Sequence, residues 1–246
     1  MSNFNARDFA LNLLKEPTSR DKQQFVGASQ FSSPCTYCVA EALQYSYAQM
    51  QGHPHVLKEP NRYWLGAVIG TAVHGLFEER GALAVPTAVI EKKIYLGTLE
   101  GYGEIWSKPD FLHVDERICL DWKTTTRAKL RFLKEASNGA QPEAVELSGL
   151  IAARYTFQKY LGQLMSYARG LVLLGYEIDT VSMVFVCRDG LTDDDVWAYT
   201  TAYDPDYAEK VFDRLVRLWE YVHSGQDINN LPSHSGCYEC STEGRV

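Results

Sequence analysis

The sequence predicts an α/β domain in which helices flank a central mixed sheet. Apolar residues recur at helical spacing in four segments: residues 34–50, 62–83, 145–174 and 204–225. Five further segments are rich in β-branched and aromatic residues and are bounded by turn-forming residues: 88–97, 103–115, 117–124, 178–188 and 196–203. Because helices precede, separate and follow these strands, we expect helices and sheet to share one core.

The composition is that of an ordinary folded domain. Of the 246 residues, 46% are hydrophobic and 22% are charged. We expect residues 1–30 to form a short amphipathic helix at 6–16 and a polar linker, and residues 31–246 to form the main domain. No apolar run approaches the roughly 20 residues of a membrane helix, and residues 1–22 lack the apolar centre of a signal peptide. We therefore expect an intracellular, cytoplasmic protein with no membrane partner.

Two acidic residues stand at the ends of predicted strands. Asp110 follows Lys108 and Pro109, and Asp121 stands two positions before Lys123. If residues 104–112 and 117–123 form adjacent antiparallel strands, the two carboxylates approach each other, and a bound magnesium ion relieves their repulsion. Lys123 shares a strand face with Asp121, where its ammonium can orient a water or stabilise phosphate charge. Taken alone, however, an Asp-x-Lys sequence is more often an exposed ion pair.

Further polar residues accompany this pair. His74 and Glu78 are four residues apart on a predicted helix, so both can face the same side. Glu91 opens the first predicted strand, and Gln163 and Tyr167 repeat the helical spacing on the long helix. Each alone has an ordinary structural explanation, such as a hydrogen-bonded histidine in a core.

Taken in order, these residues resemble a known family. The segments that carry the likeness are Gly70–His74, Glu91, Lys108–Asp110, Asp121–Lys123 and Gln163–Tyr167. Over about residues 32–241 they resemble the RecB-type branch of the PD-(D/E)XK nucleases. The resemblance implies a restriction-endonuclease-like core with Mg²⁺ or Mn²⁺ held by His74, Asp110 and Asp121. It also implies that Lys123 and Glu91 serve catalysis with the two aspartates, and that Gln163 and Tyr167 position DNA.

Four of the six cysteines form two C-x-x-C pairs, Cys35 with Cys38 and Cys237 with Cys240. In an intracellular protein this pattern favours metal ligation over disulfides, and the spacing fits either tetrahedral zinc or an iron–sulfur cluster. CRISPR-adaptation nucleases and the AddB helicase–nuclease, which the chain resembles, close their chain ends around a [4Fe–4S] cluster with one early and three late cysteines. This chain has two and two. We expect a [4Fe–4S] cluster that joins the two ends of the domain, with Zn²⁺ as the alternative.

These features predict a metal-dependent DNA nuclease. The expected activity is that of an exonuclease on single strands or duplex ends in recombination, repair or phage DNA processing, with a recombination or helicase partner. The net charge of −7 restricts any DNA surface to a local patch, and residues 123–134 carry five basic residues and no acidic one. We expect Arg127, Lys129 and Arg131 to contact DNA, although such a stretch is often only a solvated face.

Two alternatives stay open from the sequence. One is a non-catalytic DNA-binding or assembly module on the same fold, and the other is a redox or sensor protein centred on the cysteine-bound metal. Cleavage polarity, endonuclease against exonuclease action and oligomeric state are not encoded in these motifs.

Overall fold

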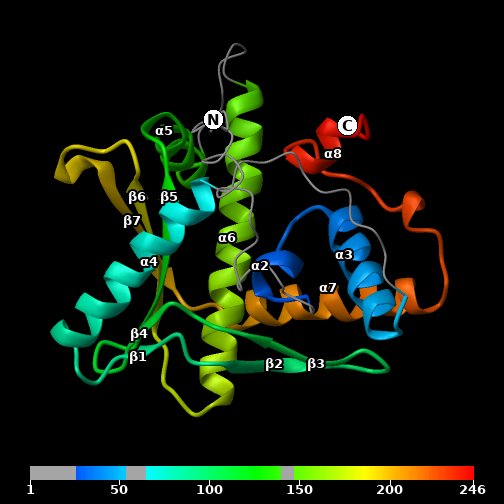
Figure 1. The fold of residues 1–246 in the computed structure, drawn as a ribbon, viewed down its shortest axis with the longest axis horizontal. Helices are drawn as coiled ribbons and strands as arrows, with labels where there is room; N and C mark the ends of the chain where they lie inside the picture. The colour runs from blue at the N-terminus through cyan, green and yellow to red at the C-terminus, as the bar shows by residue number, and fades with distance from the viewer. Residues whose placement is uncertain (1–25, 54–64, 140–146) are drawn as a thin grey trace, which may run out of the picture.

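The computed structural model describes residues 26–53, 65–139 and 147–246 (Figure 1). The helix predicted at residues 6–16 lies outside the described residues. The sequence predicts a polar linker through residue 30. In the structure Val26 and Ala28 are buried in the core, and α2 (Ala28–Phe31) forms one helical turn there. None of the described helices is long and apolar enough to cross a bilayer.

A five-stranded mixed sheet forms the centre of the fold, as the sequence predicts. Its strands are β1 (Val89–Ile90), β4 (Phe111–His113), β5 (Ile118–Thr125), β6 (Thr180–Cys187) and β7 (Val196–Ala202), in that spatial order. β5 and β6 are parallel, and every other neighbouring pair is antiparallel. β5 therefore lies in the middle of the sheet, paired along one edge with β4 and along the other with β6.

Two of the predicted strands are each divided in two. Residues 88–97 break at Glu91, whose backbone is left-handed at φ 47°, and residues 103–115 break at Lys108–Pro109, where proline has no N–H to donate. The second half of the first predicted strand, β2 (Ile94–Leu99), pairs with the first half of the next, β3 (Gly103–Ser107), as a separate two-stranded sheet. The expectation that residues 104–112 pair continuously with 117–123 is therefore wrong for 104–107, which pair with β2, and correct for 111–112.

Four of the principal helices occur where periodicity predicts them: α3 (Thr36–Met50), α4 (Leu65–Ala84), α6 (Leu147–Leu173) and α7 (Pro205–His223). A further helix, α5 (Arg127–Ser137), forms in the basic stretch, for which periodicity predicts no helix. The ends of these helices follow capping chemistry: the Asp204 carboxylate accepts from Tyr207 N–H ahead of Pro205, and α6 is followed by Gly175 at φ 92°. Near the C-terminus lie two short helices, η4 (Ile228–Asn230) and α8 (Tyr238–Thr242).

Helices cover both faces of the sheet at β5. Trp122 stacks on Phe77 of α4, with ring centroids 4.7 Å apart. Lys123, the next residue of the strand, contacts Gln163 of α6 instead. Side chains alternate along a strand, so α4 and α6 must lie on opposite faces. Figure 1 shows α6 running through the middle of the molecule, with α3, α7 and α8 on the side away from the central sheet.

Candidate active site and cysteine metal centre

The candidate active site is built around a buried ion pair on β5. Only 1% of the surface of Asp121 is exposed, and Lys123 Nζ lies 2.7 Å from its Oδ2. Burial raises the pKa of Asp121. Burial acts to lower the pKa of Lys123, but the nearby acidic groups, Asp121 foremost, together outweigh it and that pKa is raised. Lys123 therefore remains an ammonium ion, which suits a group that stabilises negative charge better than one that removes a proton.

Residues of α6 fix the position of this ammonium. Lys123 Nζ donates to Gln163 Oε1 at 3.2 Å, and Gln163 Nε2 donates to Tyr167 Oη at 2.6 Å. Nζ also lies 4.8 Å from the centroid of the Tyr160 ring. The structure thus brings the predicted Gln-x-x-x-Tyr pair to the predicted lysine, and a substitution at Gln163 acts on Lys123 directly.

Asp110 approaches the same site from the residue before β4. Its Oδ2 accepts a hydrogen bond of 2.7 Å from Trp122 N–H, which fixes the carboxylate against the backbone of β5. Its Oδ1 lies 3.4 Å from His74 Nδ1 of α4. The hydrogen bond to Asp110 raises the pKa of His74. Burial acts to raise the pKa of Asp110, but His74, Lys123 and the Trp122 N–H together outweigh it and that pKa is lowered. Burial is the main reason that the pKa of Asp121 is raised, and the charge on Asp110 adds to it.

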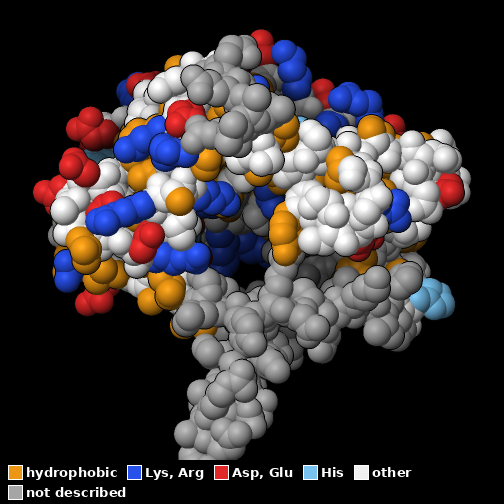
Figure 2. Space-filling view, turned by 90° about the horizontal axis from the view of Figure 1, so that it is seen from above, with side chains coloured by type: hydrophobic (Ala, Val, Ile, Leu, Met, Phe, Trp, Pro, Cys, Tyr) orange, Lys and Arg blue, Asp and Glu red, His pale blue; other side chains and the backbone are white. Residues whose placement is uncertain are grey.

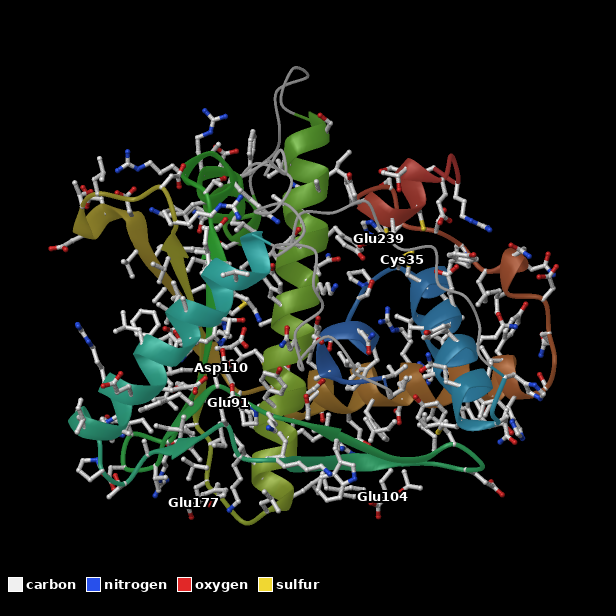
Figure 3. All side chains as sticks on the ribbon, viewed as in Figure 1. Cys35, Glu91, Glu104, Asp110, Glu177 and Glu239 are labelled. Carbon is white, nitrogen blue, oxygen red and sulfur yellow. The ribbon has the colours of Figure 1, made fainter. Side chains whose placement is uncertain are left out.

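Two glutamates complete the acidic cluster. One ligand atom each from His74, Glu78 and Glu91 lies within 4.8 Å of the others. Figure 3 shows Glu91 beside Asp110, and Glu91 N–H donates to the Asp110 carbonyl at 3.4 Å. The left-handed turn at Glu91 is what brings it here. The four-residue spacing from His74 predicts that Glu78 lies on the same helix face, although the sequence alone assigns Glu78 no metal role.

These residues fit a divalent cation. Among the described residues, none donates a hydrogen bond to the buried atoms Asp121 Oδ1 and Glu78 Oε1. A buried carboxylate oxygen without a donor is costly, and a cation would offset that cost. Carboxylate oxygens with one imidazole form a donor set typical of Mg²⁺ or Mn²⁺.

The four cysteines of the C-x-x-C pairs gather at the other end of the molecule, with their sulfur atoms all within 4.8 Å of one another. Cys38 Sγ lies 3.5 Å from the sulfurs of Cys237 and Cys240, and Cys35 Sγ lies 3.5 Å from that of Cys240. Cys35 and Cys237 are the N-cap residues of α3 and α8, so two helix N-termini converge on the centre. This confirms that the two pairs come together. The two other cysteines, Cys119 and Cys187, are buried, as expected.

The predicted basic segment, residues 123–134, covers the end of β5 and most of α5. The Arg127 guanidinium is held by both oxygens of Asp195, at 2.6 and 2.5 Å, and Arg131 lies 3.9 Å from Glu135. Desolvation, and after it the positive charges of Lys159 and Arg188, lower the pKa of Lys129. Figure 2 shows lysine and arginine side chains around a hollow in the face seen from above.

Comparisons with known proteins identify the fold. No family model and no curated protein matches the sequence. The structure is similar to the crystal structure of an alkaline exonuclease (LHK-Exo) from Laribacter hongkongensis, with a TM-score of 0.53 and 12% identity over 84% of this chain and 91% of that one. LHK-Exo in complex with dAMP matches with a TM-score of 0.50 and 12% identity, covering 90% and 94%. The mixed sheet with its flanking helices is thus an arrangement that an exonuclease also has.

Divalent cations should stabilise the protein through this site. At a Mn²⁺ concentration 100 times the dissociation constant, binding to the native state adds about 2.7 kcal/mol to the free energy of unfolding. Differential scanning fluorimetry with and without MnCl₂ measures the resulting rise in Tm. We expect Asp121→Asn to remove most of that rise and Asp213→Asn, an exposed carboxylate on α7, to keep it. An equal rise in both variants would place the cation elsewhere.

Proposed function

We propose that the protein is a metal-dependent DNA nuclease of the PD-(D/E)XK class, acting as an exonuclease on single strands or duplex ends. The observation that carries the proposal is the buried Asp121–Lys123 pair with Asp110 and His74 beside it. The fold likeness to an alkaline exonuclease supports it, and the dAMP bound to LHK-Exo supports a deoxynucleotide substrate class. Recombination, repair or phage DNA processing is the setting that such an activity serves.

In this proposal His74, Asp110 and Asp121 hold the metal, and Glu78 and Glu91 supply further oxygen ligands or bind its water. A magnesium or manganese ion there would activate water and neutralise phosphate charge. Lys123 presents its ammonium to the phosphate oxygens, because Asp121 keeps it charged and Gln163 fixes its direction. Trp122 N–H keeps Asp110 from rotating away from the site.

Asp121→Ala and Lys123→Ala should each reduce DNA cleavage at least about 100-fold, the scale seen when one transition-state contact is removed. End-labelled single-stranded and duplex DNA, incubated with Mn²⁺ or with chelator, measures cleavage and its direction. Asp213→Asn should cleave normally. A wild-type protein that binds DNA but leaves it uncut with either Mn²⁺ or Mg²⁺ would instead favour the non-catalytic module.

We further propose that the start of α5 is a DNA-contacting surface, since it directly follows the strand that carries Lys123. Burial and then the positive charges of Lys159 and Arg188 lower the pKa of Lys129, so three cationic side chains are close enough there to interact. Arg127 keeps a fixed direction through Asp195 rather than projecting freely.

Replacing Arg127, Lys129 and Arg131 together with alanine should weaken binding of single-stranded DNA and make the plot of log K against log salt shallower by about 2, since each lost phosphate contact removes about 0.7. Fluorescence anisotropy across a salt series measures both effects. Lys93→Ala is the control: it removes one positive charge from an exposed residue just before β2, away from α5. Unchanged affinity and slope in the triple variant would remove this surface from the proposal.

For the cysteine centre we propose a single tetrahedral ion, most simply Zn²⁺. Four thiolates about 2.3 Å from one ion lie about 3.8 Å apart, close to the three sulfur separations of 3.5 Å. A [4Fe–4S] cluster binds each thiolate through a different iron atom and so holds them farther apart. The ion would join α3 to α8, which stand far apart in the sequence.

Metal analysis and an absorption spectrum of anaerobically purified protein test this assignment. We expect one zinc per chain and no visible band. Cys38→Ser should lose the metal and lower the Tm, because the bound metal contributes directly to folding. Cys187→Ala, a buried cysteine outside the centre, should keep it. A brown protein with stoichiometric iron would contradict the single-ion proposal and favour the cluster.

A further inference from the structure

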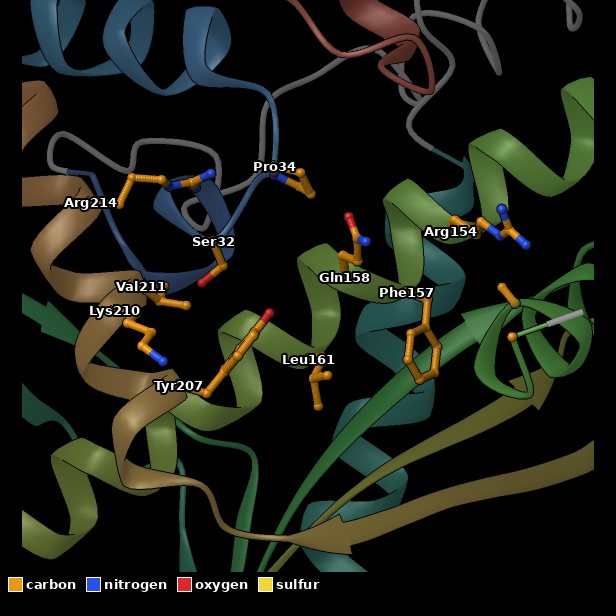
Figure 4. A pocket seen from close by; sticks show the side chains of 12 residues that line it. Ser32, Pro34, Arg154, Phe157, Gln158, Leu161, Tyr207, Lys210, Val211 and Arg214 are labelled. Atoms are coloured by element: carbon orange, nitrogen blue, oxygen red, sulfur yellow. The ribbon is translucent and has the colours of Figure 1, made fainter.

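A hollow in the surface lies away from the candidate active site. It has a volume of about 690 Å³, is open to solvent, and is lined by the turn between α2 and α3, the end of α5, and one side each of α6 and α7 (Figure 4). None of the residues that line it belongs to the acidic cluster on β4, β5 and α4. On α6, Leu161 lines the hollow and Gln163 contacts Lys123. Because a helix turns about 100° per residue, side chains at positions 161 and 163 point about 200° apart. The hollow and the candidate active site therefore use opposite sides of α6.

The hollow is positively charged. Arg154, Lys210 and Arg214 line it, and no acidic residue is among its lining. Within the described part of the chain, neither Lys210 nor Arg214 forms an ion pair. Arg214 is instead held by backbone: its Nη2 donates to the Phe31 carbonyl at 2.7 Å and also to the Ser33 carbonyl. Carbonyl oxygens fix the direction of the guanidinium without neutralising its charge, so an anion can still bind it.

A buried hydroxyl adds an independent sign of a missing ligand. Ser32 is 5% exposed, and its Oγ has no hydrogen-bond partner among the described residues. Figure 4 shows Ser32 at the same end of the hollow as Arg214, Lys210 and Tyr207. A hydroxyl that no protein group satisfies is costly when buried, and an oxygen ligand in the hollow would accept its proton.

The other part of the lining is apolar and aromatic. Phe157, Leu161 and Pro34 come from α6 and from the turn before α3. Ser32, Lys210 and Arg214 lie together at one end of the hollow, and Phe157 lies toward the other end, beside Arg154. Donors and positive charge at one end with an aromatic ring toward the other suit a ligand that has an oxyanion joined to a ring system. Phosphate joined to a nucleoside is the ligand class with that chemistry.

We propose that this hollow binds a nucleoside monophosphate group, with Lys210, Arg214 and Ser32 on the phosphate and Phe157 beside the base. The group can come from a free nucleotide or from the end of a nucleic-acid strand. The proposal does not depend on DNA cleavage, since it uses none of the residues assigned to that reaction.

The wall of this hollow is continuous with the cysteine centre. Ser33 Oγ lies 2.8 Å from Tyr155 Oη, which donates to Cys237 Sγ at 3.6 Å. Cys35 itself follows Ser32–Pro34 directly, and its N–H donates to Ser33 Oγ. Metal bound by the four cysteines would therefore also keep the phosphate end of the hollow in place.

Isothermal titration calorimetry on the full chain tests the proposal, with deoxyadenosine 5′-monophosphate, deoxyadenosine and inorganic phosphate as probes. An Asp121→Asn background and the absence of added divalent cation separate this hollow from the candidate active site. We expect the nucleotide to bind more tightly than either fragment, and Lys210→Glu to weaken it at least 10-fold. Ser32→Ala should weaken it less, and Lys93→Glu, the same charge change on an exposed residue elsewhere, should leave it unchanged.

Three results would overturn the proposal: no nucleotide binding at millimolar concentration, equal binding by wild type and Lys210→Glu, or equal affinity for the nucleotide and inorganic phosphate. Because Arg214 also holds backbone carbonyls, Arg214→Ala is not used; Lys210 is exposed and its replacement leaves the core intact. Competition by a 5′-phosphorylated oligonucleotide supports a strand end as the ligand, and its failure alongside nucleotide binding supports a free nucleotide.

Discussion

The carboxylate of Asp121 is buried on the middle strand of the sheet, and the ammonium of the half-buried Lys123 lies against it, so the surrounding structure must offset the loss of hydration. Removing two charges from water is expensive unless each finds partners. Lys123 has Asp121, Gln163 and the Tyr160 ring, whereas Asp121 Oδ1 has no donor in the described structure. Hydrogen-bond donors and positive charges are therefore too few for the carboxylates of this site, and Asp110, Glu78 and Glu91 add further negative charge. A site with this excess of buried negative charge is arranged for a cation.

The long helix α6 connects the three sites. Near its start Tyr155 contacts Cys237, in the middle Phe157 and Leu161 line the basic hollow, and Gln163 and Tyr167 then reach the ion pair. A rigid helix keeps such groups at fixed separations and on fixed sides. Metal at the cysteines would hold α3 and α8 against this helix, so its loss would affect the hollow before it affects β5.

Much of this arrangement follows from local sequence, and what does not follow depends on the backbone between elements. The periodicity of residues 34–50 and 145–174 is sufficient to predict α3 and α6, and the Asp-x-Lys alternation places Asp121 and Lys123 on one face. The division of two strands depends on a left-handed Glu91 and on Pro109, whose effects on pairing no periodicity reveals. The basic hollow was missed because Ser32, Phe157, Lys210 and Arg214 come from three distant segments, and no single segment has an unusual charge.

The most direct measurement is anomalous scattering from crystals grown with Mn²⁺, because manganese can be located independently of any activity. The account predicts a manganese peak bound by Asp110 and Asp121, with His74 as a further ligand and metal–oxygen distances of about 2.0–2.4 Å. Crystals saturated with Mn²⁺ that contain no peak between those two carboxylates, in a protein that still cleaves DNA, would contradict it.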